Sequence, residues 1–152
     1  MDTNGVIRVA IGSTQSSDTF EIQSFFSKYV LTSADDSNCK DPSYTDPIST
    51  PNSNAFIDFN GDCLPDIFLT RETEPNSANS RSYYEIYSQV FVQENGASVS
   101  KYCLSAQNGQ IVEPGQPMPL INMADFDRDG MWDLSFITQT GALTVLYNQY
   151  AA

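Results

Sequence analysis

Apolar and polar residues alternate over much of this chain with the two-residue period of β-strands, and short polar turns interrupt the alternation. The pattern is clearest over residues 83–92. A hairpin turn at residues 94–97 then leads to a returning strand at residues 99–104. The apolar residues expected on one face of the first strand are Tyr84, Ile86, Val90 and Val92.

Shorter apolar runs predict the other strands, which lie at residues 6–12, 55–57, 66–70, 120–124, 134–137 and 142–148. Residues 20–31 fit either a short helix or a strand. The likeness of Phe20-Glu21-Ile22-Gln23 to Tyr84-Glu85-Ile86-Tyr87 favours the strand. Stretches rich in Ser, Asn, Asp, Gly and Pro predict loops at residues 33–54, 72–82 and 107–119. The sequence therefore predicts an all-β fold.

Two polar runs interrupt the apolar pattern in the same way, each between two predicted strands. They are Asp58-Phe59-Asn60-Gly61-Asp62-Cys63-Leu64-Pro65-Asp66 and Asp125-Phe126-Asp127-Arg128-Asp129-Gly130-Met131-Trp132-Asp133. Oxygen-bearing side chains at alternate positions of a tight loop suit a calcium ion, so Ca²⁺ is the expected cofactor. The expected ligands are Asp58, Asn60, Asp62, Asp66 and the Leu64 carbonyl in the first loop, and Asp125, Asp127, Asp129, Asp133 and the Met131 carbonyl in the second.

Two other interpretations of these loops are weaker. An EF-hand needs flanking helices and a bidentate Glu at position twelve, where the two loops have Leu69 and Phe136. Carboxylates that merely cap turns would explain one such loop, but they fit poorly with two at the same kind of strand junction. In the first loop Cys63 takes the place of Gly130, a place that often needs the positive φ that glycine supplies cheaply.

The loops and their flanking strands resemble FG-GAP/VCBS repeats, the blade units of integrin-alpha-like β-propellers. The resemblance rests on Ala55-Phe56-Ile57-Asp58-Phe59-Asn60-Gly61-Asp62 and Met123-Ala124-Asp125-Phe126-Asp127-Arg128-Asp129-Gly130, and covers roughly residues 52–148. More narrowly, residues 52–70 and 84–133 are similar to the T-cell immunomodulatory protein family. That resemblance implies a secreted or surface-displayed ectodomain with calcium bound in its loops and no known catalysis.

On this basis we expect a single β-propeller segment of about two and a half blades. Its parts would be a degenerate partial blade at residues 1–32, a loop at 33–54, a full blade at 55–106 and a partial blade at 107–152. The blades would hold three, four and three strands, all antiparallel. The opening Asp2-Thr3-Asn4-Gly5 resembles a decayed loop without an ion. Because open blade edges invite strand addition, we expect the chain to pack with further blades or other chains.

Composition narrows the possible partners. The chain has 19 Asp and Glu against 7 Lys and Arg, a net charge of -12, which argues against nucleic acid and anionic membranes. No apolar run is long enough to span a membrane, so we expect no direct membrane insertion. The chain has no histidine, which removes Ser-His and Cys-His nucleophile chemistry. Three cysteines, Cys39, Cys63 and Cys103, allow one disulfide in any of three pairings and favour an oxidising compartment weakly.

The expected function is a calcium-stabilised extracellular protein-interaction or adhesion module of an FG-GAP repeat protein, without enzyme activity. Its partners would be proteins or further copies or blades of the same assembly. Two alternatives stay open: a structural subunit of a surface fibre or larger extracellular assembly, and a carbohydrate-active enzyme on a propeller scaffold.

Overall fold

A computed structural model of the chain describes residues 8–12, 20–24, 28–42, 46–75, 77–108 and 111–149. Most of these residues form β-strands, as predicted, and within the described ranges only Lys28 and Tyr29 are helical. The strands are β1 (Arg8–Gly12), β2 (Phe20–Ser24), β3 (Val30–Leu31), β4 (Ala55–Ile57), β5 (Asp66–Thr73), β6 (Arg81–Glu94), β7 (Ala97–Asn108), β8 (Asn122–Ala124), β9 (Asp133–Ile137) and β10 (Leu143–Leu146).

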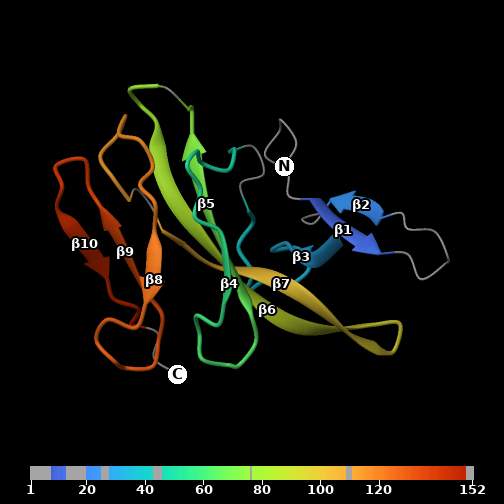
Figure 1. The fold of residues 1–152 in the computed structure, drawn as a ribbon. Helices are drawn as coiled ribbons and strands as arrows, with labels where there is room; N and C mark the ends of the chain where they lie inside the picture. Colours follow the sequence, from blue (N-terminus) through green and yellow to red (C-terminus); the bar gives the residue numbers. More distant parts are fainter. Residues whose placement is uncertain are drawn as a thin grey trace.

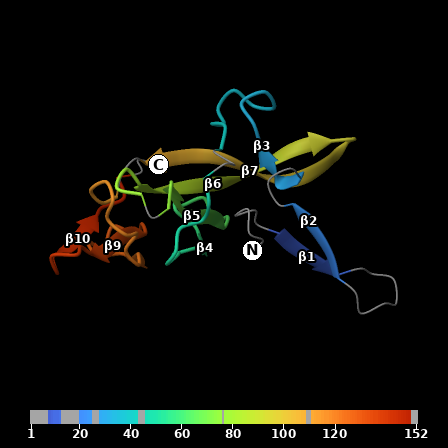
Figure 2. The ribbon, with the colours of Figure 1, turned by 90° about the horizontal axis from the view of Figure 1, so that it is seen from above.

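The strands form separate sheets that do not close into a ring within the described residues. The large sheet has the order β3-β7-β6-β5-β4, and the small sheet has the order β10-β9-β8. Strands β1 and β2 form an antiparallel pair. Figure 1 shows the small sheet standing beside the large one, and Figure 2 shows the long β6–β7 hairpin extending away from the small sheet.

Each predicted calcium loop joins two antiparallel strands, and both strand pairs have the same register. Strands β4 and β5 pair so that Ile57 lies opposite Asp66, one residue before the first loop begins and at its last position. Strands β8 and β9 pair in the same way, with Ala124 opposite Asp133. Because register fixes which side chains share a face, equivalent positions of the two sheets can be compared one by one.

Two hydrophobic cores lie on opposite faces of the large sheet. One face, with Ile67, Leu69 and Tyr87, packs against residues such as Val30 and Ile48 from the segment before β4. The other face packs against the small sheet. The buried members of this second core are Phe59 and Phe68 from the large sheet and its loop, and Ile121, Leu134 and Phe136 from the small sheet and the residue before it.

The first of these faces also holds a buried ion pair. Arg71 donates to Glu85, and both residues are almost fully buried. Tyr87 donates its hydroxyl to the same carboxylate at 2.7 Å, and Arg71 donates to the Asp46 carbonyl at 2.6 Å. Burial, followed by a hydrogen bond to Asp46, raises the pKa of Tyr83, which also faces this network. Removing one partner of such a pair typically costs about 3–5 kcal/mol of folding free energy, because the other charge stays buried.

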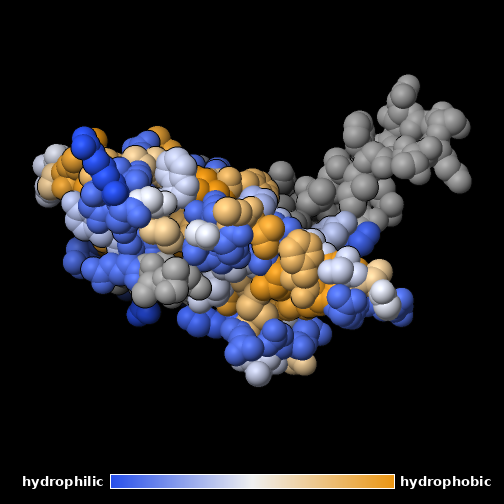
Figure 3. Space-filling view, turned by 90° about the horizontal axis from the view of Figure 1, so that it is seen from below, coloured by the Kyte–Doolittle hydropathy of each residue, from blue (hydrophilic) through white to orange (hydrophobic). Residues whose placement is uncertain are grey.

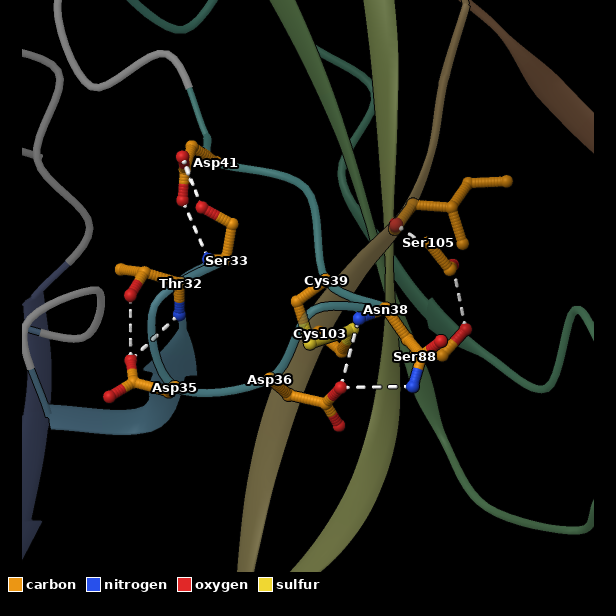
Figure 4. Close-up of a disulfide and its surroundings, with 11 residues drawn as sticks. Thr32, Ser33, Asp35, Asp36, Asn38, Cys39, Asp41, Ser88, Cys103 and Ser105 are labelled. Atoms are coloured by element: carbon orange, nitrogen blue, oxygen red, sulfur yellow. Dashed lines mark hydrogen bonds between the residues drawn. A yellow bond between two sulfur atoms is a disulfide. The ribbon is translucent and has the colours of Figure 1, made fainter.

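A disulfide fastens the covering segment to the large sheet. Cys39 and Cys103 are bonded across 64 residues of sequence, while Cys63 is a free, exposed thiol. A bond that closes a loop of this length typically stabilises the fold by about 2–4 kcal/mol. Beside it, the Lys40 N–H donates to the Leu104 carbonyl at 3.1 Å. Figure 4 shows the loop around this disulfide, where Asp35 accepts from Thr32.

The structure corrects several expected boundaries. Residues 20–31 hold two strands separated by other residues, and the second of them, β3, pairs in parallel with β7. The predicted first unit of three strands is therefore wrong: β1 and β2 pair alone, and β3 joins the large sheet as a fifth strand. The loop expected at residues 72–82 is shorter, because β5 continues to Thr73 and β6 begins at Arg81.

Candidate metal centre

The second loop gathers carboxylates at one point. Asp125, Asp127 and Asp133 each offer an oxygen, and these oxygens all lie within 4.8 Å of one another. Calcium–oxygen distances are about 2.3–2.6 Å, so oxygens separated by less than about 5 Å can share one ion. Asp133 is fully buried at the start of β9, whereas Asp125 and Asp127 are exposed. This donor set of hard oxygens fits calcium.

Backbone N–H groups hold these side chains in place. The Asp125 carboxylate accepts from the N–H of Asp129 at 3.1 Å and from that of Gly130 at 3.0 Å. The Asp129 carboxylate accepts from the Met131 N–H at 2.8 Å. Asp129 is not part of the cluster of three carboxylates, although the sequence predicted it as a ligand.

The first loop repeats these hydrogen bonds position by position. The Asp58 carboxylate accepts from the N–H groups of Asp62 at 3.1 Å and Cys63 at 2.8 Å, as Asp125 does from Asp129 and Gly130. Asp58 also accepts from Gly61 at 2.7 Å. The Asp62 carboxylate accepts from the Leu64 N–H at 2.8 Å, as Asp129 does from Met131. The two loops are therefore the same local structure built twice.

The last carboxylate of each loop connects three strands. Asp66 and Asp133 each accept one N–H from the second residue of their loop and one from the end of the pairing with the third strand. The donors are Phe59 at 2.9 Å and Gln89 at 3.1 Å for Asp66, and Phe126 at 2.8 Å and Asn148 at 2.8 Å for Asp133. Gln89 and Asn148 lie two residues beyond Tyr87 and Leu146, which pair with equivalent residues of β5 and β9.

Both loops need positive φ at their fourth and sixth positions, but they use glycine differently. In the first loop Gly61 has φ 76° and Cys63 has φ 66°. In the second loop Arg128 has φ 65° and Gly130 has φ 90°. Each loop therefore has one glycine and one residue with a side chain in the left-handed region, where side chains are strained. The expectation that the position of Cys63 needs positive φ is confirmed.

The loops differ most in charge at their third position. Asn60 in the first loop donates its amide to the Asp62 carboxylate at 2.9 Å, whereas the second loop has a carboxylate at Asp127. Local desolvation, followed by the charges of neighbouring carboxylates that include Asp133, raises the pKa of Asp127. The second loop thus carries more acid repulsion for an ion to offset.

Burial affects the first loop at its ninth position. Desolvation raises the pKa of Asp66, and the N–H groups of Phe59 and Gln89 act in the opposite direction. The charges of Asp62 and Asp58 raise this pKa further.

The two loops lie next to each other. A methyl group added at Gly61 would lie 3.6 Å from the sulfur of Met131 in the second loop. The Asn148 amide also donates to the Phe59 carbonyl at 2.9 Å. Figure 3 views the molecule from below, the side on which both loops lie in Figure 1, and shows hydrophobic side chains at the surface between hydrophilic ones. An ion in either loop would therefore act on a shared surface.

Sequence reasoning located both loops and their flanking strands. It missed Gln89 and Asn148, because their part in the loops depends on the register of the third strand rather than on any local motif. The roles of the Leu64 and Met131 carbonyls stay predictions. The opening run at residues 2–5 lies outside the described residues.

Comparison of the chain with protein-family models, with curated proteins and with solved structures gives no match. Among the described residues, no helix has the length and apolar character needed to cross a membrane. The disulfide is compatible with an oxidising, extracellular setting.

Proposed function

We propose that this chain is a calcium-stabilised interaction module of the FG-GAP/VCBS type that works outside the cell. The observation that carries the proposal is the repeated loop, with matching hydrogen bonds at Asp58 and Asp125 and the same strand register on both sides. Turn-capping carboxylates have no physical need to recur with this detail, whereas two equivalent ion sites do. Propeller blades of this family are the arrangement that would place such loops side by side.

The ion would be held by Asp125, Asp127 and Asp133 in the second loop, and by Asp58, Asn60 and Asp66 in the first. When bound, it would supply positive charge against a surplus of acid, 19 against 7 basic residues. The exposed, weakly enclosed positions favour the affinity of extracellular modules, with dissociation constants of about 10⁻⁴–10⁻³ M. Its role would be structural, because it would bind together strands that an adhesion surface needs to keep fixed.

Calorimetric titration with calcium, together with thermal unfolding in calcium and in EDTA, tests this proposal. Saturation at about a hundred times the dissociation constant should add about 2.7 kcal/mol to the free energy of unfolding for each site. Asp125→Ala should remove one site and leave the other. Glu113→Gln, an exposed acid outside both loops, is the matched control. Identical unfolding curves in calcium and in EDTA would refute the proposal.

A second candidate is a subunit of a larger extracellular assembly. It is favoured by the outer face of the small sheet, where Ile137 and Leu143 lie opposite each other on adjacent strands. They are 62% and 66% exposed. By register they are equivalent to Thr70 and Tyr84, on the face of the large sheet that the small sheet covers. Sedimentation over a range of concentrations tests this candidate, and a strictly monomeric chain would contradict it.

A further inference from the structure

A pocket of about 310 Å³ opens between the two sheets, beside both Asp loops. Its apolar floor includes Phe59 and Leu134, which are both 5% exposed. Phe59 lies against Phe68, and Phe68 stacks on Tyr84, which also lines the pocket. The ring centroids are 5.7 and 5.5 Å apart. This ladder of rings gives the pocket a rigid base, as preformed ligand sites require.

The rim carries two exposed aromatic rings. Trp132, from the second loop, is 41% exposed, and Tyr147, after β10, is 55% exposed. Large aromatic rings left half in water at the mouth of a pocket are costly unless they contact something, and they offer flat surfaces to a ligand. Trp132 is the only tryptophan of the chain.

The polar part of the lining is uncharged. A register shift in the β6–β7 pairing leaves Ser105 opposite no residue of β6. Its hydroxyl lies 2.8 Å from that of Ser88 and 3.2 Å from the Ile86 carbonyl (Figure 4). Such bulges commonly re-aim a side chain next to a functional site. The other polar lining groups are amides, Asn60, Asn148 and Gln149.

This lining limits the chemistry of a ligand. It contains no Asp, Glu, Lys or Arg, so it offers neither an anionic partner for a cation nor a cationic partner for an anion. The net charge of -12 also repels anions. Hydroxyls and amides both donate and accept hydrogen bonds, which suits ligand hydroxyls that do the same. Exposed rings suit a ligand with apolar C–H faces.

We propose that this pocket binds a neutral saccharide of about one or two rings, a size that matches the small end of the range for ligand pockets. One C–H face of the sugar would lie on Trp132 or Tyr147, and its hydroxyls would meet Ser88, Ser105 and the amides. The proposal names a ligand for the interaction module and rests on that proposed function. The adjoining loops would hold the rim in place when they bind calcium.

The single tryptophan gives a direct test. In calcium-saturated full-length chain, galactose, mannose, glucose, N-acetylglucosamine and their neutral disaccharides would be titrated while the fluorescence of Trp132 is followed. We expect at least one neutral sugar to shift this emission saturably. Glucuronic acid should bind at least about tenfold more weakly than the neutral sugar, because nearby carboxylates repel it.

Variants separate recognition from folding. Calorimetry should show about tenfold weaker sugar binding in Tyr147→Ala and in Ser105→Ala, and at least as large a loss in Trp132→Ala. Phe91→Ala, which removes an aromatic ring that is 58% exposed on the β6–β7 hairpin, should bind as the unmodified chain does. Circular dichroism shows whether each variant folds, and Tyr147→Ala keeps the test valid if Trp132→Ala does not.

Calcium binding is measured on the same sample before any sugar is added, so the two proposals can fail separately. Normal calcium binding with no response to any neutral sugar would overturn the saccharide proposal alone. Saturable binding of N-acetylphenylalanine amide in place of sugar would also overturn it, since the pocket would then recognise an apolar peptide side chain.

Discussion

The two sheets carry the same loop, but their surroundings differ. Phe59, the second residue of the first loop, is 5% exposed and packs against the small sheet. Phe126, at the same position of the second loop, is 44% exposed. The difference does not lie in the local sequence, because both loops place Phe between two oxygen ligands. It comes from what covers each sheet.

The large sheet is covered on both faces, and the small sheet on one. One face of the large sheet contacts Val30 and Ile48, and the other contacts the small sheet through Leu134 and Phe136. The small sheet has equivalent apolar positions on its outer face, where Ile137 and Leu143 are mostly exposed. The outer face of the small sheet is thus built as a covered face is, although no described residue shields these two side chains.

The largest expected contrast is between the two phenylalanines. Phe59→Ala should lower the free energy of unfolding by about 3–5 kcal/mol, because it opens a cavity between the sheets. Phe126→Ala should lower it by about 1 kcal/mol or less, since part of the ring is already in water. Urea unfolding of both variants in calcium measures the contrast. Equal losses would mean that Phe126 is covered in solution and would break the comparison.

The second contrast concerns association rather than stability. Leu143→Asp places a charge on the outer face of the small sheet, where it should change the free energy of unfolding by only about 0.5 kcal/mol. If that face is a contact between chains, the variant should abolish any concentration-dependent association seen by sedimentation. Phe91→Asp, on the distant hairpin, should leave association unchanged and serves as the control. Association that survives Leu143→Asp would place the contact elsewhere.

The loops could be predicted because their information is local. Alternate oxygen side chains, a glycine and flanking apolar runs all lie within a few residues, so Asp58 and Asp125 stood out without any knowledge of the fold. The antiparallel strand pairs around them followed for the same reason. The Tyr84 and Ile86 face was also predicted, and it does pack against the small sheet.

The covered side of the large sheet could not be predicted, because its partners are distant in sequence. Arg71 and Glu85 look like surface charges in the sequence, and only the register of β5 and β6 brings them together in the interior. The parallel addition of β3 and the choice of Cys39 and Cys103 as the disulfide likewise depend on how the segment before β4 folds back. No local pattern specifies that path.

The smallest contrast tests the backbone of the loops, where glycine and a residue with a side chain occupy opposite positions. Gly130 has φ 90°, and a methyl group there would meet no atom within 4 Å, so Gly130→Ala changes only conformational strain. We expect it to lower the free energy of unfolding by about 1–2 kcal/mol. Cys63→Gly relieves the same strain at the equivalent position, but glycine also adds about 0.4–1 kcal/mol of conformational entropy to the unfolded chain. The two terms nearly cancel, so this variant should stay within about 0.5 kcal/mol of the unmodified chain. Urea unfolding in EDTA isolates the backbone effect from the ion. A neutral Gly130→Ala would show that the second loop does not keep its positive φ in solution, and the equivalence of the two loops would then fail at its sixth position.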